Sequence, residues 1–234
     1  MRKFAKLLLV LLGAVGQCAA QPQPAPTQAN VATQKTVFEN EFVRVVELRV
    51  PPGVFEAKHS HARGVTVALS AYDNEMTDFP AGTVTRRHTK FGEVRWAEPV
   101  THEARNTGTT EQRVLRVELK RDAPGQVSGA TKGTPDPLDS LIVCKDTQKL
   151  IFENQFVRVI EERVPAGVAQ PKHRHGHGVL IPLANSDIES VDDPGGQPTR
   201  RHLQFGEAGW REPVVHAVKN VGTTELLNIR IELK

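Results

Sequence analysis

The sequence has little cysteine, few aromatic residues, and no long apolar run outside its N-terminus. Aromatic residues make up 5% of the chain, which argues against an aromatic platform for stacking nucleobases. Its two cysteines, Cys18 and Cys144, are too few for a disulfide framework. The hydrophobic content of 38% is enough for an ordinary packed core.

The first 20 residues resemble a secretory signal peptide. Three basic residues, Arg2, Lys3 and Lys6, precede the short apolar run 7–15, and small residues precede a cleavage site after Ala20. The apolar run is too short for a stable membrane span, which argues against a retained membrane anchor. We therefore expect an exported protein, periplasmic or secreted.

A lipoprotein anchored at Cys18 is a further alternative. It ranks behind simple cleavage because Gln17 stands where lipid attachment favours a small residue. Cleavage would lower the formal net charge from +3 to zero, leaving no basic surplus for nucleic acid or an anionic membrane. It would also leave Cys144 alone, so that stability must come from packing rather than from an intramolecular disulfide.

The chain repeats itself without gaps at an offset of 114 residues. "VFENEFVRVVELRVPPGV" from Val37 returns as "IFENQFVRVIEERVPAGV" from Ile151, and about half of the paired positions are identical. The repeat predicts a signal peptide at 1–20, a disordered Gln/Pro/Ala-rich linker at 21–32, a domain at 33–120, a linker at 121–146 and a second domain at 147–234.

Each copy consists of short segments with strand character. The segments 42–50 and 156–164 are rich in β-branched residues and end in Pro/Gly turns, whereas 115–119 and 229–233 alternate apolar and charged residues. No helical period is sustained. The pattern predicts an all-β fold, a sandwich or barrel in each copy.

Two histidines one residue apart, His59 and His61, would project from the same face of a strand. With His102 from a later strand they could converge on one metal ion. Copy two repeats the set, so the candidate ligands are His59, His61, His102, His173, His175 and His216. His177 is a further candidate in copy two, either as an extra ligand or at the barrel rim, and we expect copy two to be the better-equipped site.

These histidines lie in a frame that resembles the cupin superfamily. The spacing from Gly53 to His59 and His61 is similar to the first half of the first cupin motif, and Gly92, Pro99, His102 and Asn106 resemble the second motif. Both motifs recur in copy two, so nearly the whole mature chain resembles a bicupin. The second motif is also similar to that of small bacterial cupins, including the type linked to β-alanine degradation. The resemblance implies two tandem jelly-roll β-barrels, each with a metal inside.

One feature of the cupin pattern is missing. Cupins usually carry a Glu four or five positions after the second histidine, where this chain has Val65 and Thr66, and Val179 and Leu180. Its absence argues against oxalate oxidation or decarboxylation on manganese. The resemblance then implies a three-histidine site in which Fe(II) is favoured, with Zn, Mn and Ni as alternatives.

The leading hypothesis is a metal-dependent, dioxygenase-like oxidoreductase acting on a small organic molecule. One alternative is a non-catalytic binding or structural bicupin, and the other is a lyase or isomerase that uses the ion as a Lewis acid. We expect a small-molecule partner, no nucleic acid, and a homodimer as one oligomeric option. The residues do not identify a catalytic acid or base.

Several further residues have weaker patterns. Strand alternation turns Arg87 and Arg201 inward, to bind a substrate carboxylate or, more in keeping with the pattern, a structural Glu. Glu93 and Glu207, just after the turn glycine, are also expected to be structural. We expect Trp96 and Trp210 to pack in the core or between the copies. His88 and His202 should face solvent, because Leu203 next to His202 should face the core.

Overall fold

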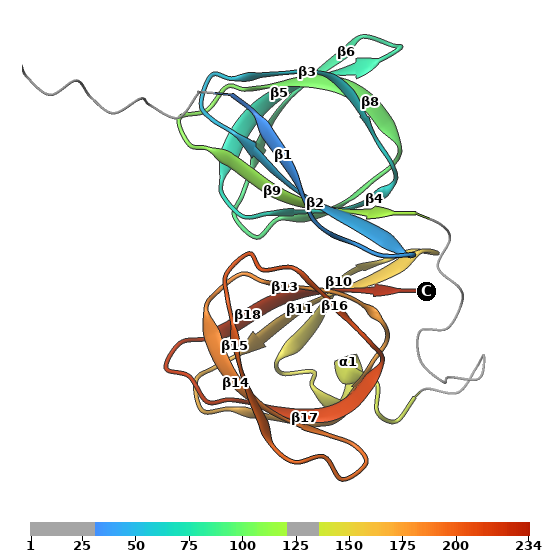
Figure 1. Ribbon diagram of the computed structural model, residues 1–234, viewed down its shortest axis with the longest axis vertical. Coiled ribbons are helices and arrows are strands. Elements are labelled where there is room, and N and C mark those ends of the chain that lie inside the picture. The colour runs from blue at the N-terminus through green and yellow to red at the C-terminus, as the bar shows by residue number, and fades with distance from the viewer. Residues whose placement is uncertain (1–30, 121–135) are drawn as a thin grey trace, which may run out of the picture. The chain divides into compact units, whose positions relative to one another are not determined.

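The computed structural model describes residues 31–120 and 136–234, and each copy of the repeat forms a jelly-roll β-barrel (Figure 1). The predicted signal peptide at 1–20 lies outside the described residues, as do most of the linker 21–32 and positions 121–135. Within the described ranges, no helix has both the length and the apolar character needed to cross a membrane.

The first barrel is formed by nine strands in two antiparallel sheets. The strands are β1 (Thr33–Glu39), β2 (Val43–Val50), β3 (Phe55–His61), β4 (Gly64–Ala68), β5 (Tyr72–Phe79), β6 (Thr83–Thr89), β7 (Val94–Ala97), β8 (Val100–Asn106) and β9 (Gln112–Leu119). The five-stranded sheet has the order β1-β2-β9-β4-β7, and the four-stranded sheet has the order β3-β8-β5-β6.

The second barrel repeats this topology strand for strand. Its strands are β10 (Gln148–Glu153), β11 (Val157–Val164), β12 (Ala169–His175), β13 (Gly178–Pro182), β14 (Ser186–Asp192), β15 (Thr199–Leu203), β16 (Gly209–Arg211), β17 (Val214–Asn220) and β18 (Leu226–Leu233). Its sheets have the orders β10-β11-β18-β13-β16 and β12-β17-β14-β15.

A short helix, α1 (Ser140–Val143), precedes the second barrel. Asp139 caps it by accepting a hydrogen bond from the Leu141 backbone N–H at 2.9 Å, and the same carboxylate pairs with Arg158 at 2.5 Å. Arg174 on β12 binds Asp136 at 2.8 Å. The described end of the predicted linker 121–146 is therefore packed against the second barrel.

The central strand of each five-stranded sheet is buried on both faces. In β9, Leu115 and Val117 belong to the main apolar cluster, whereas the alternating Arg116 and Glu118 are 8% and 3% exposed. Alternation of apolar and charged residues usually indicates a half-solvated strand. Here the charged face points into the barrel, which places ion pairs beside the candidate metal ligands.

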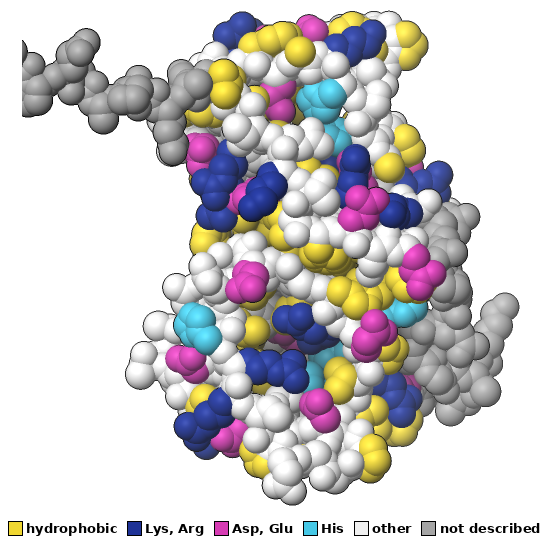
Figure 2. All heavy atoms as spheres, in the orientation of Figure 1, with side chains coloured by type: hydrophobic (Ala, Val, Ile, Leu, Met, Phe, Trp, Pro, Cys, Tyr) yellow, Lys and Arg dark blue, Asp and Glu magenta, His cyan; other side chains and the backbone are white. Residues whose placement is uncertain are grey.

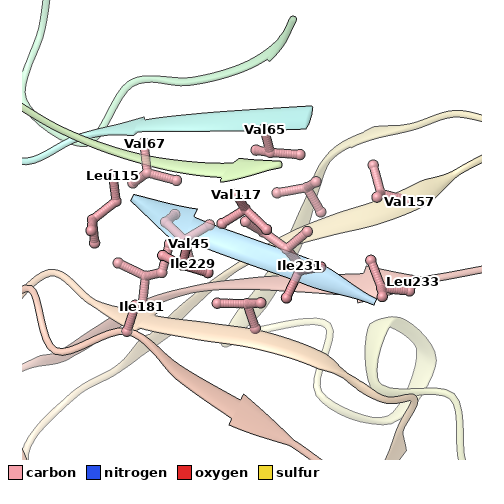
Figure 3. Packing of buried hydrophobic residues seen from close by; sticks show 14 of the residues in the cluster. Val45, Val65, Val67, Leu115, Val117, Val157, Ile181, Ile229, Ile231 and Leu233 are labelled. Atoms are coloured by element: carbon pink, nitrogen blue, oxygen red, sulfur yellow. The ribbon is translucent and has the colours of Figure 1, made fainter. Parts of the chain in front are cut away.

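The main apolar cluster contains residues of both copies, so the outer faces of the two five-stranded sheets pack together (Figure 3). Val45 and Val117 come from the first barrel, and Ile181 and Ile231 come from the second. Burial of this shared face is the main stabilising contact between the copies. Outside it, basic and acidic side chains are interspersed over the face that Figure 2 shows.

Aromatic pairs flank this shared core symmetrically. Phe42 stacks on Trp210 with ring centroids 5.3 Å apart, and the equivalent pair, Trp96 and Phe156, also lies at 5.3 Å. The prediction that both tryptophans pack in the core or between the copies is confirmed.

In each barrel a glycine three residues after the second histidine of the His-x-His pair packs directly against the central strand. A Cβ on Gly64 would lie 2.0 Å from the Val117 carbonyl oxygen, and one on Gly178 would lie 2.0 Å from that of Ile231. The absence of a side chain lets β4 and β13 approach the central strands, which carry the acidic partners of the histidines.

Candidate metal centre

Three histidines meet inside each barrel on two paired strands. In the first barrel His59 and His61 lie on β3, and His102 lies directly opposite His59 on β8. In the second, His173 and His175 lie on β12 with His216 opposite His173 on β17. All six histidines predicted as ligands are thus grouped as expected, three to a barrel.

The spacing of the first triad suits one small ion. The Nε2 atom of His59 lies 3.1 Å from the Nε2 atoms of both His61 and His102. Two nitrogens about 2.1 Å from an ion, at about 90–110° to one another, are about 3.0–3.4 Å apart. The three side chains could therefore hold a metal ion without rearrangement.

Hydrogen bonds at the other ring nitrogens fix the tautomers. His59 Nδ1 lies 2.7 Å from the Ala57 carbonyl oxygen, which can only accept, so Nδ1 must donate. His61 Nδ1 donates to Glu118 at 2.8 Å. In the neutral rings each Nε2 then carries a lone pair. Lone pairs that face one another at 3.1 Å repel, and a cation between them would relieve that repulsion.

The second barrel repeats this arrangement. His173 Nδ1 donates to the Pro171 carbonyl oxygen at 2.7 Å, and His175 Nδ1 donates to Glu232 at 2.8 Å. The Nε2 atoms of His173, His175 and His216 are buried and have no hydrogen-bond partner within the described ranges. A carboxylate that orients a histidine in this way also raises its basicity toward a metal.

Lowered pKa values favour the neutral form of His102, His173 and His216, which is the form that binds a metal. Burial, and then the neighbouring histidines, lower the pKa of His102 to about 4. Burial and His175 lower the pKa of His173 to about 4, and burial and His173 lower that of His216 to about 3. Neutral imidazoles at neutral pH leave their lone pairs free for coordination.

The two triads differ in their surroundings. His173 and His175 are 0% and 1% exposed, whereas all three histidines of the first barrel are half-buried. His61 and His102 line a cavity of about 460 Å³, which also contacts Arg87, Arg95 and Arg116. This volume lies within the range of small-molecule sites.

A carboxylate that the sequence pattern did not reveal enters the second barrel. Glu162 on β11 places its Oε1 atom 3.5 Å from His175 Nε2 and 3.6 Å from Arg230 Nε. Burial alone would raise the pKa of Glu162, but the Arg230 guanidinium and His175 lower it below its usual range. An ionised oxygen thus stands beside the triad, although it comes from another strand than the missing cupin Glu.

The first barrel also has a buried carboxylate, but it comes from a different strand than Glu162 does in the second barrel. Position 48, equivalent to Glu162, is Leu, but Glu56 on β3 is 8% exposed and lines the cavity. Burial raises the pKa of Glu56, against a smaller opposite effect of His59. In the second barrel this position is Gln170, which donates to Thr147 at 2.9 Å. A comparison of the two copies at inward-facing positions could have found both acids.

The remaining predicted residues lie outside the triads. His177 is in ring contact with Phe42 and Trp210 at 5.3 and 5.6 Å, and the structure does not bring it to the His173 group. Arg63, its equivalent in the first copy, lies over Phe156. The additional histidine of copy two thus occupies a position between the copies.

The arginines and histidines of the repeated "TRRH" segments lie in different environments. Arg87 lines the cavity and pairs with Glu93, so the favoured pairing with a structural Glu is observed for this arginine. Arg201 lies opposite the buried Ile188 on β14 and so shares its predicted face of the sheet, but the residue is exposed. His88 and His202 pair with Asp73 and Asp187 at the surface, as predicted, and both side chains are more than half exposed.

Comparison with solved structures places this arrangement among the cupins. AerE from Microcystis aeruginosa aligns over 91% of this chain and 96% of its own, with a TM-score of 0.61 and 12% identity. Oxalate decarboxylase from Bacillus subtilis, which has Mn(II) centres, aligns over 86% of this chain and 72% of its own, with a TM-score of 0.57 and 14% identity.

A cupin 2 conserved barrel domain protein from Leptotrichia buccalis aligns over 90% of this chain and 92% of its own, with a TM-score of 0.52 and 9% identity. At the level of sequence, no family model and no curated protein matches. At these identities the likeness establishes the fold: the chain has the cupin fold, as two tandem barrels.

Proposed function

We propose that the protein is an exported, metal-dependent oxidoreductase that acts on a small organic molecule in a dioxygenase-like reaction. The observation that supports this most directly is the convergence of three imidazole nitrogens in each barrel. In the first barrel, acceptors hold the Nδ1 atoms of His59 and His61. Fe(II) is the favoured ion, since three imidazoles suit it and leave open positions.

The protein's own residues have separable roles in this proposal. A redox-active ion with three neutral ligands keeps its full charge and would supply the oxidising chemistry. Glu118 holds His61 in position and is itself bound by Arg44 at 2.6 Å. Glu56, whose pKa burial raises, is the group we assign to accept or release a proton inside the cavity.

A Lewis-acid lyase or isomerase is the second candidate. It is favoured by the same acid, because Glu56 lines the cavity with His61 and His102 and could act as a base without any redox step. A purely structural role is favoured only for the second barrel, whose triad is more deeply buried. Export rests on the N-terminal pattern, and the homodimer remains a prediction.

Metal analysis of the purified chain tests the proposal. We expect two ions per chain, falling to one in His59→Ala/His102→Ala and to one in His173→Ala/His216→Ala. The matched control is His88→Ala/His202→Ala, which removes two exposed histidines and should leave both ions. Stoichiometric iron with O₂ uptake would support the oxidoreductase, zinc without O₂ uptake would favour the Lewis-acid reaction, and a chain that takes up no ion would refute both.

A further inference from the structure

The interiors of the two barrels differ at four of five equivalent positions. In the second barrel these positions form a separate apolar cluster: Val164, Ile188, Leu203, Val218 and Leu226. In the first barrel the same positions are Val50, Asn74, Thr89, Ala104 and Gln112. One side of the second interior is thus filled by apolar side chains, whereas the first has polar and smaller residues there.

The polar replacements are buried without being satisfied. Asn74 and Gln112 are each 5% exposed, and each has an amide oxygen without a hydrogen-bond partner in the described part of the chain. Both residues line the cavity of about 460 Å³. Buried amides are nearly always hydrogen-bonded, so these two groups indicate a polar molecule that enters the cavity.

Three arginines, Arg87, Arg95 and Arg116, line the cavity together with three acidic residues, Glu56, Asp78 and Glu98. Arg116 donates to the Ala62 carbonyl oxygen and lies 3.4 Å from Glu118, but that carboxylate is already bound to His61 and Arg44. The Arg95 guanidinium makes no hydrogen bond or ion pair with the described residues, and burial followed by the nearby Arg87 charge lowers its pKa. An anionic ligand would relieve this crowding of guanidinium groups.

The second barrel provides its own anion at the equivalent place. Glu162 lies between His175 and Arg230, and it accepts hydrogen bonds from Gln148 and Asn228 at 3.1 Å each. In the first barrel the same positions are Leu48, His61, Arg116, Gln34 and Val114, all of which line the cavity. The first barrel therefore keeps the histidine and the arginine but lacks the carboxylate between them.

We propose that the first barrel binds a small organic carboxylate. Its carboxylate group lies between His61 and Arg116, where the second barrel has Glu162, and its hydroxyl or amino group reaches Asn74 and Gln112. The second barrel is closed to such a ligand by its own acid and its apolar cluster. The binding of this ligand does not depend on the proposed function. Only its role as a substrate rests on that function.

Titration calorimetry of the purified full chain tests the inference. Lactate, malate and alanine are the probes, with lactamide as the uncharged control, and metal content is measured on the same samples. We expect one binding site per chain for at least one acid and at least tenfold weaker binding of the amide. No binding of any of the three acids, equal binding of acid and amide, or two equal sites per chain would overturn the inference.

Two variants transfer the second interior into the first. Leu48→Glu/Val114→Asn installs the built-in acid with its hydrogen-bond donor, and Asn74→Ile/Thr89→Leu/Ala104→Val/Gln112→Leu installs the apolar cluster. Each set of side chains already packs in the second barrel, which favours folding, and a melting curve checks it. Each should weaken acid binding at least tenfold, whereas Leu150→Glu at an exposed position should not.

Unchanged binding in both folded variants would overturn the inference. Metal analysis separates its failure from that of the proposed function. Suppose that the chain binds the acids without any metal ion and that Leu48→Glu/Val114→Asn abolishes this binding. The inferred carboxylate site would then stand, and the proposed metal-dependent function would be refuted. If the chain binds two ions but none of the acids, the carboxylate site would be refuted and the proposed metal-dependent function would stand.

Discussion

The two barrels have the same topology and the same triad but different interiors. The first triad is half-buried and opens on a cavity lined by three arginines, whereas the second lies beside Glu162 in an interior that also contains an apolar cluster. Duplication preserved the strand pairing and the histidine positions, because these depend on backbone register. The inward-facing residues were free to diverge, because each barrel needs only a filled or a satisfied interior.

The largest expected effect is on catalytic activity and tests whether only the first barrel is catalytic. We expect His59→Ala/His102→Ala to lower activity at least 100-fold, about 2.7 kcal/mol in activation free energy, because it removes the ion next to the cavity. His173→Ala/His216→Ala should lower it less than tenfold in a steady-state assay. Equal losses would show that both barrels catalyse, and His88→Ala/His202→Ala is the control.

The buried acid distinguishes the barrels in stability. Glu162→Leu leaves Arg230 without its interior partner and should lower the free energy of unfolding by about 3–5 kcal/mol in a urea titration. Glu189→Gln, which breaks an exposed pair with Arg200, should cost about 0–1 kcal/mol. A loss below 1 kcal/mol for Glu162→Leu would mean that Arg230 finds another partner.

Gly64 and Gly178 should respond alike to substitution, because both barrels keep the same close approach to the central strand. Gly64→Ala and Gly178→Ala each place a Cβ 2.0 Å from a backbone oxygen, so each should destabilise the chain by about 1–3 kcal/mol. Thermal melting measures both. A neutral result for one alone would show that its barrel relaxes more easily.

The smallest expected effect is a dependence of stability on pH in metal-free protein. The pKa values of His102, His173 and His216 are about 4, 4 and 3 in the folded chain, below the ordinary value of 6.5. The unfolded chain therefore binds more protons between about 3 and 6.5, and stability falls as pH drops through this window.

Melting temperatures in EDTA at pH 7 and pH 5 measure this dependence. We expect His173→Ala/His216→Ala to flatten it more than His102→Ala, because the double variant removes two histidines with lowered pKa values and the single variant removes one. An increase in stability on acidification would contradict the neutral, buried state of these rings.

Much of the fold and of the candidate site followed from local pattern. The His-x-His spacing predicted a shared face because strands alternate, and the repeat supplied His216 as the counterpart of His102. Glu162 and Glu56 were missed because single acids in alternating strands are usually solvated, and only the closed barrel turns them inward.

The sequence by itself determined the duplication, the strand character and the grouping of the six histidines, since these depend on residue order and on the period of a strand. Only the tertiary structure decided which polar groups are buried together and which of them lack a partner. Whether the side chain at position 48 or 162 meets an arginine depends on strands far apart in the chain, and that contact distinguishes the two barrels.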